Sequence, residues 1–264
     1  MDIQIAERYA DVKTFARYQL EHNTKRQPIG IERGLTVTTD LVQGLPTFNV
    51  KQYFGSQPTI FDDYDHVVTA YSKDDGRVVS LIGARWLGDA DFRFLYLWTA
   101  MVADEYRNSG VFRRSLAYFF ERVANSPSPD PRSGGQRMPP LIVTKTYNPV
   151  VYRIFSSFAR AGRGVELYPL IPAEQQPETL VTLAKKIAYA ISPKMQLIEQ
   201  TGVVLGGQAL VAPDFFPLME ESKDEDVNRH FQQHVSRADQ VLCILRIPDS
   251  DNGAVLSAVT AALR

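Results

Sequence analysis

Residues 102–116 read Val102-Ala103-Asp104-Glu105-Tyr106-Arg107-Asn108-Ser109-Gly110-Val111-Phe112-Arg113-Arg114-Ser115-Leu116. The apolar run 94–102 leads into this stretch and predicts a strand, and apolar residues at helical spacing continue from it to Val123. A polar turn with one glycine therefore joins a strand to the start of a helix. Unpaired amides and the helix dipole make such a start attractive to anions, and Arg107, Arg113 and Arg114 add full charges. We expect this turn to bind a phosphate or pyrophosphate.

Two common phosphate-binding loops are absent from the sequence. There is no G-x-x-x-x-G-K-[ST], which argues against an ordinary P-loop. There is also no G-x-G-x-x-G after a strand, so the dinucleotide fingerprint is missing. What remains is R-x-x-G-x-Φ, formed by Arg107, Gly110 and Phe112.

The flanking segments predict a definite order of strands and helices. Asp75-Gly76 lies between two β-branched runs and is a strong hairpin signal. Asn148 and Pro149 suit the cap and the first turn of a helix. In chain order we expect strands over 66–71, 78–87 and 94–102, a helix from about 112, a strand over 141–145, a helix over 149–159 and a final strand over 165–168.

This order, together with Arg107 and Gly110, resembles the GNAT superfamily of N-acetyltransferases, whose pyrophosphate loop follows Q/R-x-x-G-x-G/A. Phe112 departs from that pattern where the family has a small residue, although its ring could point into the core. The resemblance covers residues 60–170 and implies an α/β (α+β) fold. The expected sheet is mixed, mostly antiparallel and twisted, with one splayed parallel strand pair and helices on both faces.

The resemblance also implies acetyl-CoA as co-substrate, lying in the gap between the splayed strands. Strand backbone would hold the pantetheine arm, loop amides the pyrophosphate, and arginines the phosphate oxygens through charge-assisted hydrogen bonds. Asn148 matches a family asparagine near the pantetheine, and it is equally well explained as a helix cap. The residues assigned to this ligand are Ala100, Met101, Val102, Arg107, Asn108, Ser109, Gly110, Val111, Phe112, Arg113, Arg114 and Asn148.

Acetyl transfer to an amine depends mainly on placing the amine against the thioester carbonyl, with a backbone N–H to polarise that carbonyl. An acid then protonates the leaving thiolate. The family's usual tyrosine position falls on Phe155, which cannot donate a proton. Tyr152 is therefore the first candidate for the acid and Tyr147 the second, while the alternative for Tyr152 is a packing role with a hydrogen-bonded tip.

No general base stands out. The two acidic residues after the strand sit in a turn and could serve only as a helix cap, and the other two candidates are residue types that are more often ordinary solvated or satisfied groups. Water or the amine's own equilibrium could serve instead. The acidic segment 62–65 could attract a cationic amine or form a solvated turn. The possible bases are Asp104, Glu105, Glu166 and His66.

Composition bounds the class of protein. The chain has 264 residues, of which 44% are hydrophobic and 22% charged, with a net charge of −1 and one cysteine. A near-neutral charge argues against nucleic acid as a partner, and no apolar run is long enough for a membrane span. The N-terminus lacks the blocks of a signal peptide, and a single cysteine fits the reducing cytoplasm.

Cys243 fits a buried strand, and His230 and His234 fit a solvated helix face, so we expect no metal.

Two units are expected: a GNAT-like domain over 1–172 and an extension over 173–264. The extension could cover the acceptor site, form a homodimer contact or extend the sheet. The loop 125–140 is long and rich in proline and serine. Further expected elements are helices over 3–20, 177–191, 224–238 and 253–264, a hairpin over 195–211 and a strand over 240–247.

These features favour a soluble N-acyltransferase of GNAT type. We expect it to move an acetyl group from acetyl-CoA to a small-molecule or protein amine by direct attack in a ternary complex. The alternative is a non-catalytic domain that binds an acyl-CoA as a sensor or scaffold, which the phenylalanine at position 155 and the missing base favour.

Overall fold

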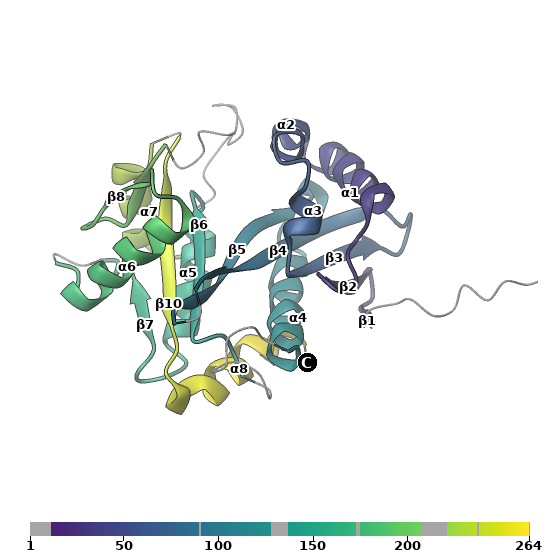
Figure 1. Cartoon of the computed structure of the whole chain (residues 1–264). Helices are drawn as coiled ribbons and strands as arrows, with labels where there is room; N and C mark the ends of the chain where they lie inside the picture. Colours follow the sequence, from purple (N-terminus) through teal and green to yellow (C-terminus); the bar gives the residue numbers. More distant parts are fainter. Residues whose placement is uncertain are drawn as a thin grey trace, which may run out of the picture.

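One sheet of ten strands runs through the computed structural model, which describes residues 12–89, 91–127, 137–172, 175–206, 221–236 and 238–263 (Figure 1). The strand order is β1-β2-β3-β4-β5-β6-β10-β9-β8, and β7 also pairs with β10. The strands are β1 (Val12–Thr14), β2 (Tyr18–Thr24), β3 (His66–Ser72), β4 (Val78–Gly88), β5 (Arg93–Val102), β6 (Leu141–Thr146), β7 (Glu166–Tyr168), β8 (Gln196–Ile198), β9 (Val203–Leu205) and β10 (Gln240–Arg246).

Helices cover both faces of this sheet (Figure 1). The predicted strands before and after the Arg107 loop, the helix that follows it and the Asn148-capped helix are all present, with bounds within a few residues of those expected. The helices are α1 (Ile31–Gly44), α2 (Val50–Gly55), α3 (Ile60–Asp63), α4 (Val111–Asn125), α5 (Pro149–Ala159), α6 (Glu178–Ile191), α7 (Glu225–His234) and α8 (Asn252–Thr260).

The parallel pair β5–β6 is the feature that opens the sheet. All other strand pairs are antiparallel, and the parallel register runs only from Leu95 opposite Ile142 to Leu97 opposite Thr144. Both strands continue beyond that point without pairing to each other. A register shift between β4 and β5 leaves Trp98 as an extra residue, and such a bulge bends its strand. The predicted splayed strand pair is therefore present.

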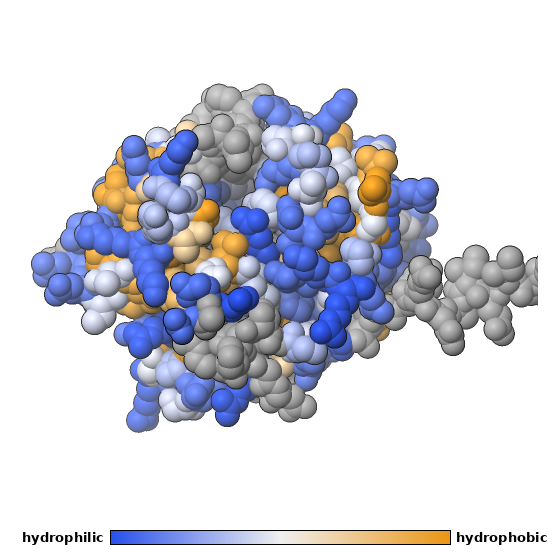
Figure 2. All heavy atoms as spheres, in the orientation of Figure 1, coloured by the Kyte–Doolittle hydropathy of each residue, from blue (hydrophilic) through white to orange (hydrophobic). Residues whose placement is uncertain are grey.

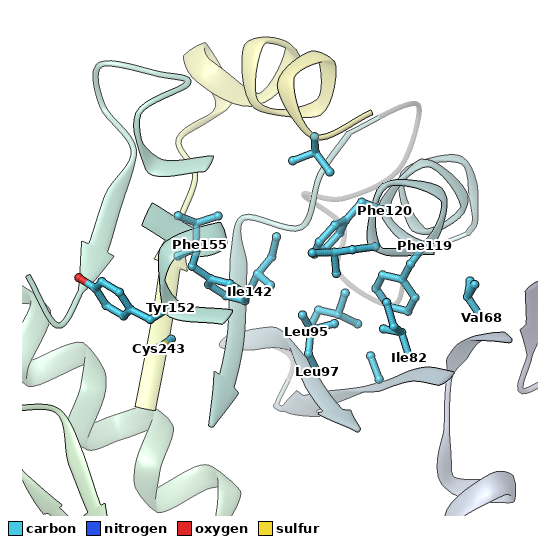
Figure 3. Packing of buried hydrophobic residues seen from close by; sticks show 14 of the residues in the cluster. Val68, Ile82, Leu95, Leu97, Phe119, Phe120, Ile142, Tyr152, Phe155 and Cys243 are labelled. Carbon is cyan, nitrogen blue, oxygen red and sulfur yellow. The ribbon is translucent and has the colours of Figure 1, made fainter. Parts of the chain in front are cut away.

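Alternating side chains of β5 serve two different cores. Leu95 and Leu97 pack with Phe119 and Phe120 of α4 on one face (Figure 3). Tyr96 points to the opposite face, into a cluster that includes side chains of α6. A third cluster joins α1 and α2 to β3, β4 and the end of β5. The splayed end of β5 thus lies between helices on both sides.

The C-terminal segment extends the sheet. Strand β10 lies between β6 and β9, and its residues 241–246 pair with β6 along the whole of that strand. The predicted strand at 165–168 forms as β7, and among the described strands it pairs only with β10. Residues 241–245 are buried on both faces, as is typical of a central strand. The helices α6, α7 and α8 and the β8–β9 hairpin confirm the remaining expectations for the described part of this segment.

The helix expected over residues 3–20 is wrong where the structure describes it. Residues 12–14 and 18–24 are β1 and β2, and residues 3–11 lie outside the described part. Tyr18 and Leu20 are buried while Gln19 between them is exposed, which is the period of a strand. Pairing of β2 with β3 decides the outcome, because a short apolar pattern fits both periods.

The face of the molecule drawn in Figure 2 carries both hydrophilic and hydrophobic residues. Figure 2 shows an apolar area over α1, where the side chains of Ile31 and Leu35 are 79% and 64% exposed. None of the helices in the described ranges is long and apolar enough to span a membrane. The central part of the loop expected over 125–140, residues 128–136, lies outside the described part.

Candidate functional site

A cavity of about 460 Å³ opens where β5 and β6 part. Its walls come from the end of β5, the loop before α4, the start of α5, and α2 with the loop before it. The cavity brings together most of the residues predicted from the sequence. Those that line it are Ala100, Met101, Val102, Arg107, Asn108, Gly110, Phe112, Arg113, Tyr147 and Asn148, whereas Ser109, Val111, Arg114 and Tyr152 do not.

The end of β5 offers main-chain groups to the cavity. Beyond Leu97, β5 is paired with β4 on one side only. Strand groups that point away from the partner remain available for an extended ligand. Ala100, Met101 and Val102 line the cavity there.

The loop before α4 is shaped by two left-handed residues, Asn108 with φ 62° and Gly110 with φ 80°. Within the described ranges, the amides of Gly110, Phe112 and Arg113 have no protein acceptor. Two of the other predicted amide donors are already engaged: Ser109 N–H donates to the Tyr106 carbonyl at 3.2 Å, and Val111 N–H donates to Ser109 Oγ at 3.3 Å. Fewer loop amides are therefore free than the sequence predicted, and the free ones lie at the start of the helix, where an anion would be favoured.

The three arginines of this loop have different roles. Arg107 and Arg113 line the cavity, and Arg107 also forms an ion pair with Asp104 at 3.0 Å. Arg114 instead donates to the Tyr18 hydroxyl at 3.2 Å, with its guanidinium over the Phe15 ring. Arg114 is thus directed toward β2 and away from the cavity.

Phe112 and Asn148 each line the cavity and also make a contact that holds the fold together. Phe112 is half-buried, and it both lines the cavity and packs against the core cluster that contains α4. Asn148 caps α5, since its Oδ1 accepts from Val150 N–H at 2.8 Å, and it also lines the cavity. The capping hydrogen bond and the position in the cavity wall are therefore compatible for Asn148.

Tyr152 is not at the cavity. Its side chain is 1% exposed, and its hydroxyl donates to the Pro169 carbonyl at 2.7 Å. Figure 3 shows its ring beside Cys243, with the oxygen directed away from Leu97 of β5. The buried face of α5 carries Pro149, Tyr152 and Phe155, whereas its Val150, Val151 and Ile154 face the cavity. The packing alternative describes Tyr152 in this structure, and burial raises its pKa.

None of the possible bases lines the cavity. Asp104 and Glu105 pair with Arg107 and Arg77, and Glu166 pairs with Arg246 at 2.9 Å. The segment 62–65 lies elsewhere too: Asp63 accepts from the Thr59 hydroxyl, and Asp65 accepts from Trp86 N–H at 2.7 Å. Among the described residues, no carboxylate lines the cavity.

His66 lies in the core instead. Its Nδ1 is 3.2 Å from Nε2 of His22, and its ring contacts Phe119 of α4 edge-on. Burial lowers the pKa of His66 to about 4, against a smaller opposing effect of Asp65. Burial, with the neighbouring His66, lowers the pKa of His22 to about 3. The pair is therefore neutral at pH 7.

Several polar residues that line the cavity were not predicted from the sequence. Tyr53 of α2 lies with its hydroxyl 2.6 Å from Thr99 Oγ1, which also accepts from Tyr64 at 2.6 Å. Lys145 of β6 and Gln240 of β10 line the cavity where the strands part. Burial raises the pKa of Tyr53 to about 12 and lowers that of Lys145 to about 8. For these residues, the sequence offered one signal, which is that Lys145 stands near the end of a mostly apolar strand.

Residues outside the cavity account for the other candidates. Cys243 is fully buried in β10, and burial raises its pKa. The Nε2 atom of His230 lies 2.9 Å from the Thr201 carbonyl oxygen. In the described part of the chain, no group of three or more His, Cys, Asp or Glu residues is placed to hold a metal ion.

Strand order and site geometry together define the class of fold. A mostly antiparallel sheet with one splayed parallel pair, a bulge in β5 and a glycine-containing helix start beside the splay form a GNAT-like α/β fold. The architecture predicted from the resemblance is thereby confirmed.

Solved acetyltransferases include similar folds. Diaminobutyrate acetyltransferase EctA from Paenibacillus lautus is 16% identical, with 62% of this chain and 88% of that chain covered and a TM-score of 0.37. Naa50 from Arabidopsis thaliana is 16% identical, with 60% and 93% covered and a TM-score of 0.35. The N-acetyltransferase YhbS from Escherichia coli is 16% identical, with 58% and 71% covered and a TM-score of 0.34. No family model and no curated protein matches the sequence.

Proposed function

We propose that the protein is an acetyl-CoA-dependent N-acyltransferase acting on a small-molecule or protein amine. The observation that carries this proposal is the cavity at the β5–β6 splay, which is lined by open strand backbone and by the start of α4. Free amides at Gly110, Phe112 and Arg113, together with the charges of Arg107 and Arg113, suit a pyrophosphate. The backbone of 100–102 suits the amides of a pantetheine arm.

In this proposal the acceptor amine attacks the thioester carbonyl carbon directly. The new C–N bond forms as the C–S bond breaks, and the electron pair of that bond leaves on sulfur. A main-chain N–H of β5 polarises the carbonyl oxygen. Tyr147, the predicted acid candidate that lines the cavity, gives its proton to the thiolate. Solvent takes the proton of the amine, and the cations along the cavity favour the uncharged amine that attack requires.

The alternative, a domain that binds acyl-CoA without turnover, also has support. The Phe112 ring lines the cavity near the start of α4, and no carboxylate of the described residues lines it to act as a base. Both observations are compatible with a ligand that is held but not consumed.

Thiol release separates the two functions. The protein is incubated with acetyl-CoA and a panel of amines, and free thiol is measured together with the thermal shift produced by coenzyme A. Amine-dependent thiol release is the expected result. A thermal shift without release by any amine would indicate the sensor, and the absence of both signals would overturn coenzyme A binding altogether.

Arg113→Ala is expected to weaken coenzyme A binding by about five- to ten-fold, because it removes a charge-assisted hydrogen bond to phosphate. Arg114→Ala is the matched control from the next residue of the same helix turn. Since Arg114 bonds Tyr18, this change should leave the dissociation constant within about two-fold. Isothermal titration calorimetry measures both, and equal losses in the two variants would contradict the assignment.

Tyr147→Phe is expected to lower kcat by about ten-fold while KM changes little, because water replaces the acid only in part. Tyr152→Phe should leave kcat unchanged. It should instead lower the free energy of unfolding by about 1–2 kcal/mol, since the buried Pro169 carbonyl loses its donor. Steady-state kinetics and urea unfolding check the pair. A loss of kcat in Tyr152→Phe with normal folding would return the acid role to that residue.

A further inference from the structure

The part of the cavity on the α2 and α6 side has its own chemistry. Along β6, Leu141 and Val143 pack in the cluster that contains α6, so Lys145 shares their face by strand alternation. The phosphate-binding groups lie at the start of α4, whose helix covers the other face. Lys145 therefore belongs to the acceptor half of the cavity, opposite the place proposed for the pyrophosphate.

This acceptor half carries aromatic rings, amides and a cation. Tyr53, Tyr96 and Trp98 supply the rings, and Gln57 and Gln240 supply the amides. A second cation lies behind this wall, because the Arg85 guanidinium carbon is 4.0 Å from the Trp98 ring centroid. The Nε of Arg85 is buried and has no hydrogen-bond partner among the described residues. The electrostatic character of this half is thus positive.

Such a wall discriminates between classes of amine. A polyamine or an aminoglycoside would place a further positive charge against Lys145, which is unfavourable in a partly desolvated site. A carboxylate would accept charge-assisted hydrogen bonds from the ammonium and from side-chain amides. The ammonium has three donors, so Lys145 can keep a protein partner and still bind an anion. Flat rings suit an aromatic or apolar body on the acceptor.

We infer that the acceptor is an amine that also bears a carboxylate, held by Lys145 with Gln240 and packed against the aromatic wall of Tyr53, Tyr96 and Trp98. This inference rests on the proposed function and specifies its substrate class. Burial lowers the pKa of Lys145 to about 8, so desolvation disfavours the charged form of this side chain. A bound carboxylate would stabilise that charged form, which is consistent with an acidic group on the acceptor.

Matched acceptors with and without the negative charge test the inference. Phenylalanine is compared with phenylalaninamide, 4-(aminomethyl)benzoate with its amide, and spermidine serves as the polycation. Binding in the presence of coenzyme A is measured by calorimetry, and kcat/KM by thiol release. We expect at least one acid to bind about ten-fold or more tightly than its amide, and spermidine to bind weakest.

Variants of the lysine complete the experiment. Lys145→Gln should reduce the preference for acid over amide to about two-fold or less, and Lys145→Arg should retain most of it. Lys25→Gln, an exposed change at the end of β2, is the control and should alter nothing. Equal binding of acids and amides, tighter binding of spermidine, or an unchanged preference in Lys145→Gln would overturn the inference. Because binding is measured directly, preferential binding of acids without thiol release would remove the proposed turnover and leave the ligand class standing.

Discussion

Gly110→Glu is expected to weaken coenzyme A binding by about 100-fold or more, because it sets a carboxylate against the phosphates at the start of α4. A Cβ at this position would meet no atom within 4 Å, so the new side chain has room to extend toward the cavity. The same glycine has φ 80°, and the left-handed conformation costs a non-glycine residue about 1–2 kcal/mol of folding free energy. Calorimetry with coenzyme A measures the first effect, and urea unfolding measures the second.

Gly76→Glu is the matched control for this experiment. Gly76 lies in the β3–β4 hairpin with φ 75°, and a Cβ there also meets nothing within 4 Å. The backbone strain is therefore comparable, but the hairpin does not line the cavity. We expect a similar loss of stability with coenzyme A binding unchanged. If both variants bound the coenzyme as tightly as the natural protein does, the anion site would have to be sought away from α4.

Acidification from pH 7.5 to 5.0 is expected to lower the free energy of unfolding by about 4 kcal/mol through His22 and His66 alone. Both side chains are nearly inaccessible, at 3% and 5% exposure, and their ring nitrogens are 3.2 Å apart. Their pKa values are about 3 and 4 in the folded protein, against 6.5 for an ordinary histidine. The unfolded chain therefore binds more protons below pH 6.5, so stability declines as the pH falls through that value toward 4.

The double variant His22→Gln/His66→Gln isolates this effect. Two amides can hydrogen-bond to each other without titrating, so the variant should lose most of the histidine contribution to the pH dependence. Urea unfolding at pH 7.5, 6.0 and 5.0 gives the slopes for both proteins. The same slope in the variant and in the natural chain would assign the acid sensitivity to carboxylates and not to the core pair.

Much of the fold near the site could be predicted because its signals are local. The hairpin at Gly76, the left-handed glycine at 110 and the Asn148-Pro149 cap each act over a few residues of chain. Short apolar and β-branched runs bounded by turn residues identified β3, β4 and β5 for the same reason. By contrast, the segment up to Leu20 satisfies a helical pattern and still forms β2, since pairing with β3 is a contact between distant parts of the chain.

Side-chain direction around the cavity was harder to predict than the position of the loop. Arg113 and Arg114 are neighbours in sequence, yet only Arg113 lines the cavity, because Tyr18 of a distant strand binds the other. Tyr152 was the preferred acid, but α5 turns that face toward β10 and the Pro169 carbonyl. Lys145 of β6 and Tyr53 of α2 both line the cavity, although no sequence motif links these two elements.

By itself, the sequence determined the elements that flank the turn before α4 and the glycine on which that turn depends, because backbone preferences and helix capping act within one or two turns of chain. Tertiary structure alone decided that β10 completes the sheet beside β6, that β5 and β6 separate after Leu97, and which side chains face the gap. Those outcomes depend on burial and strand pairing between residues far apart in sequence. Such contacts contribute to stability only after the sheet has assembled, so no local pattern reports them.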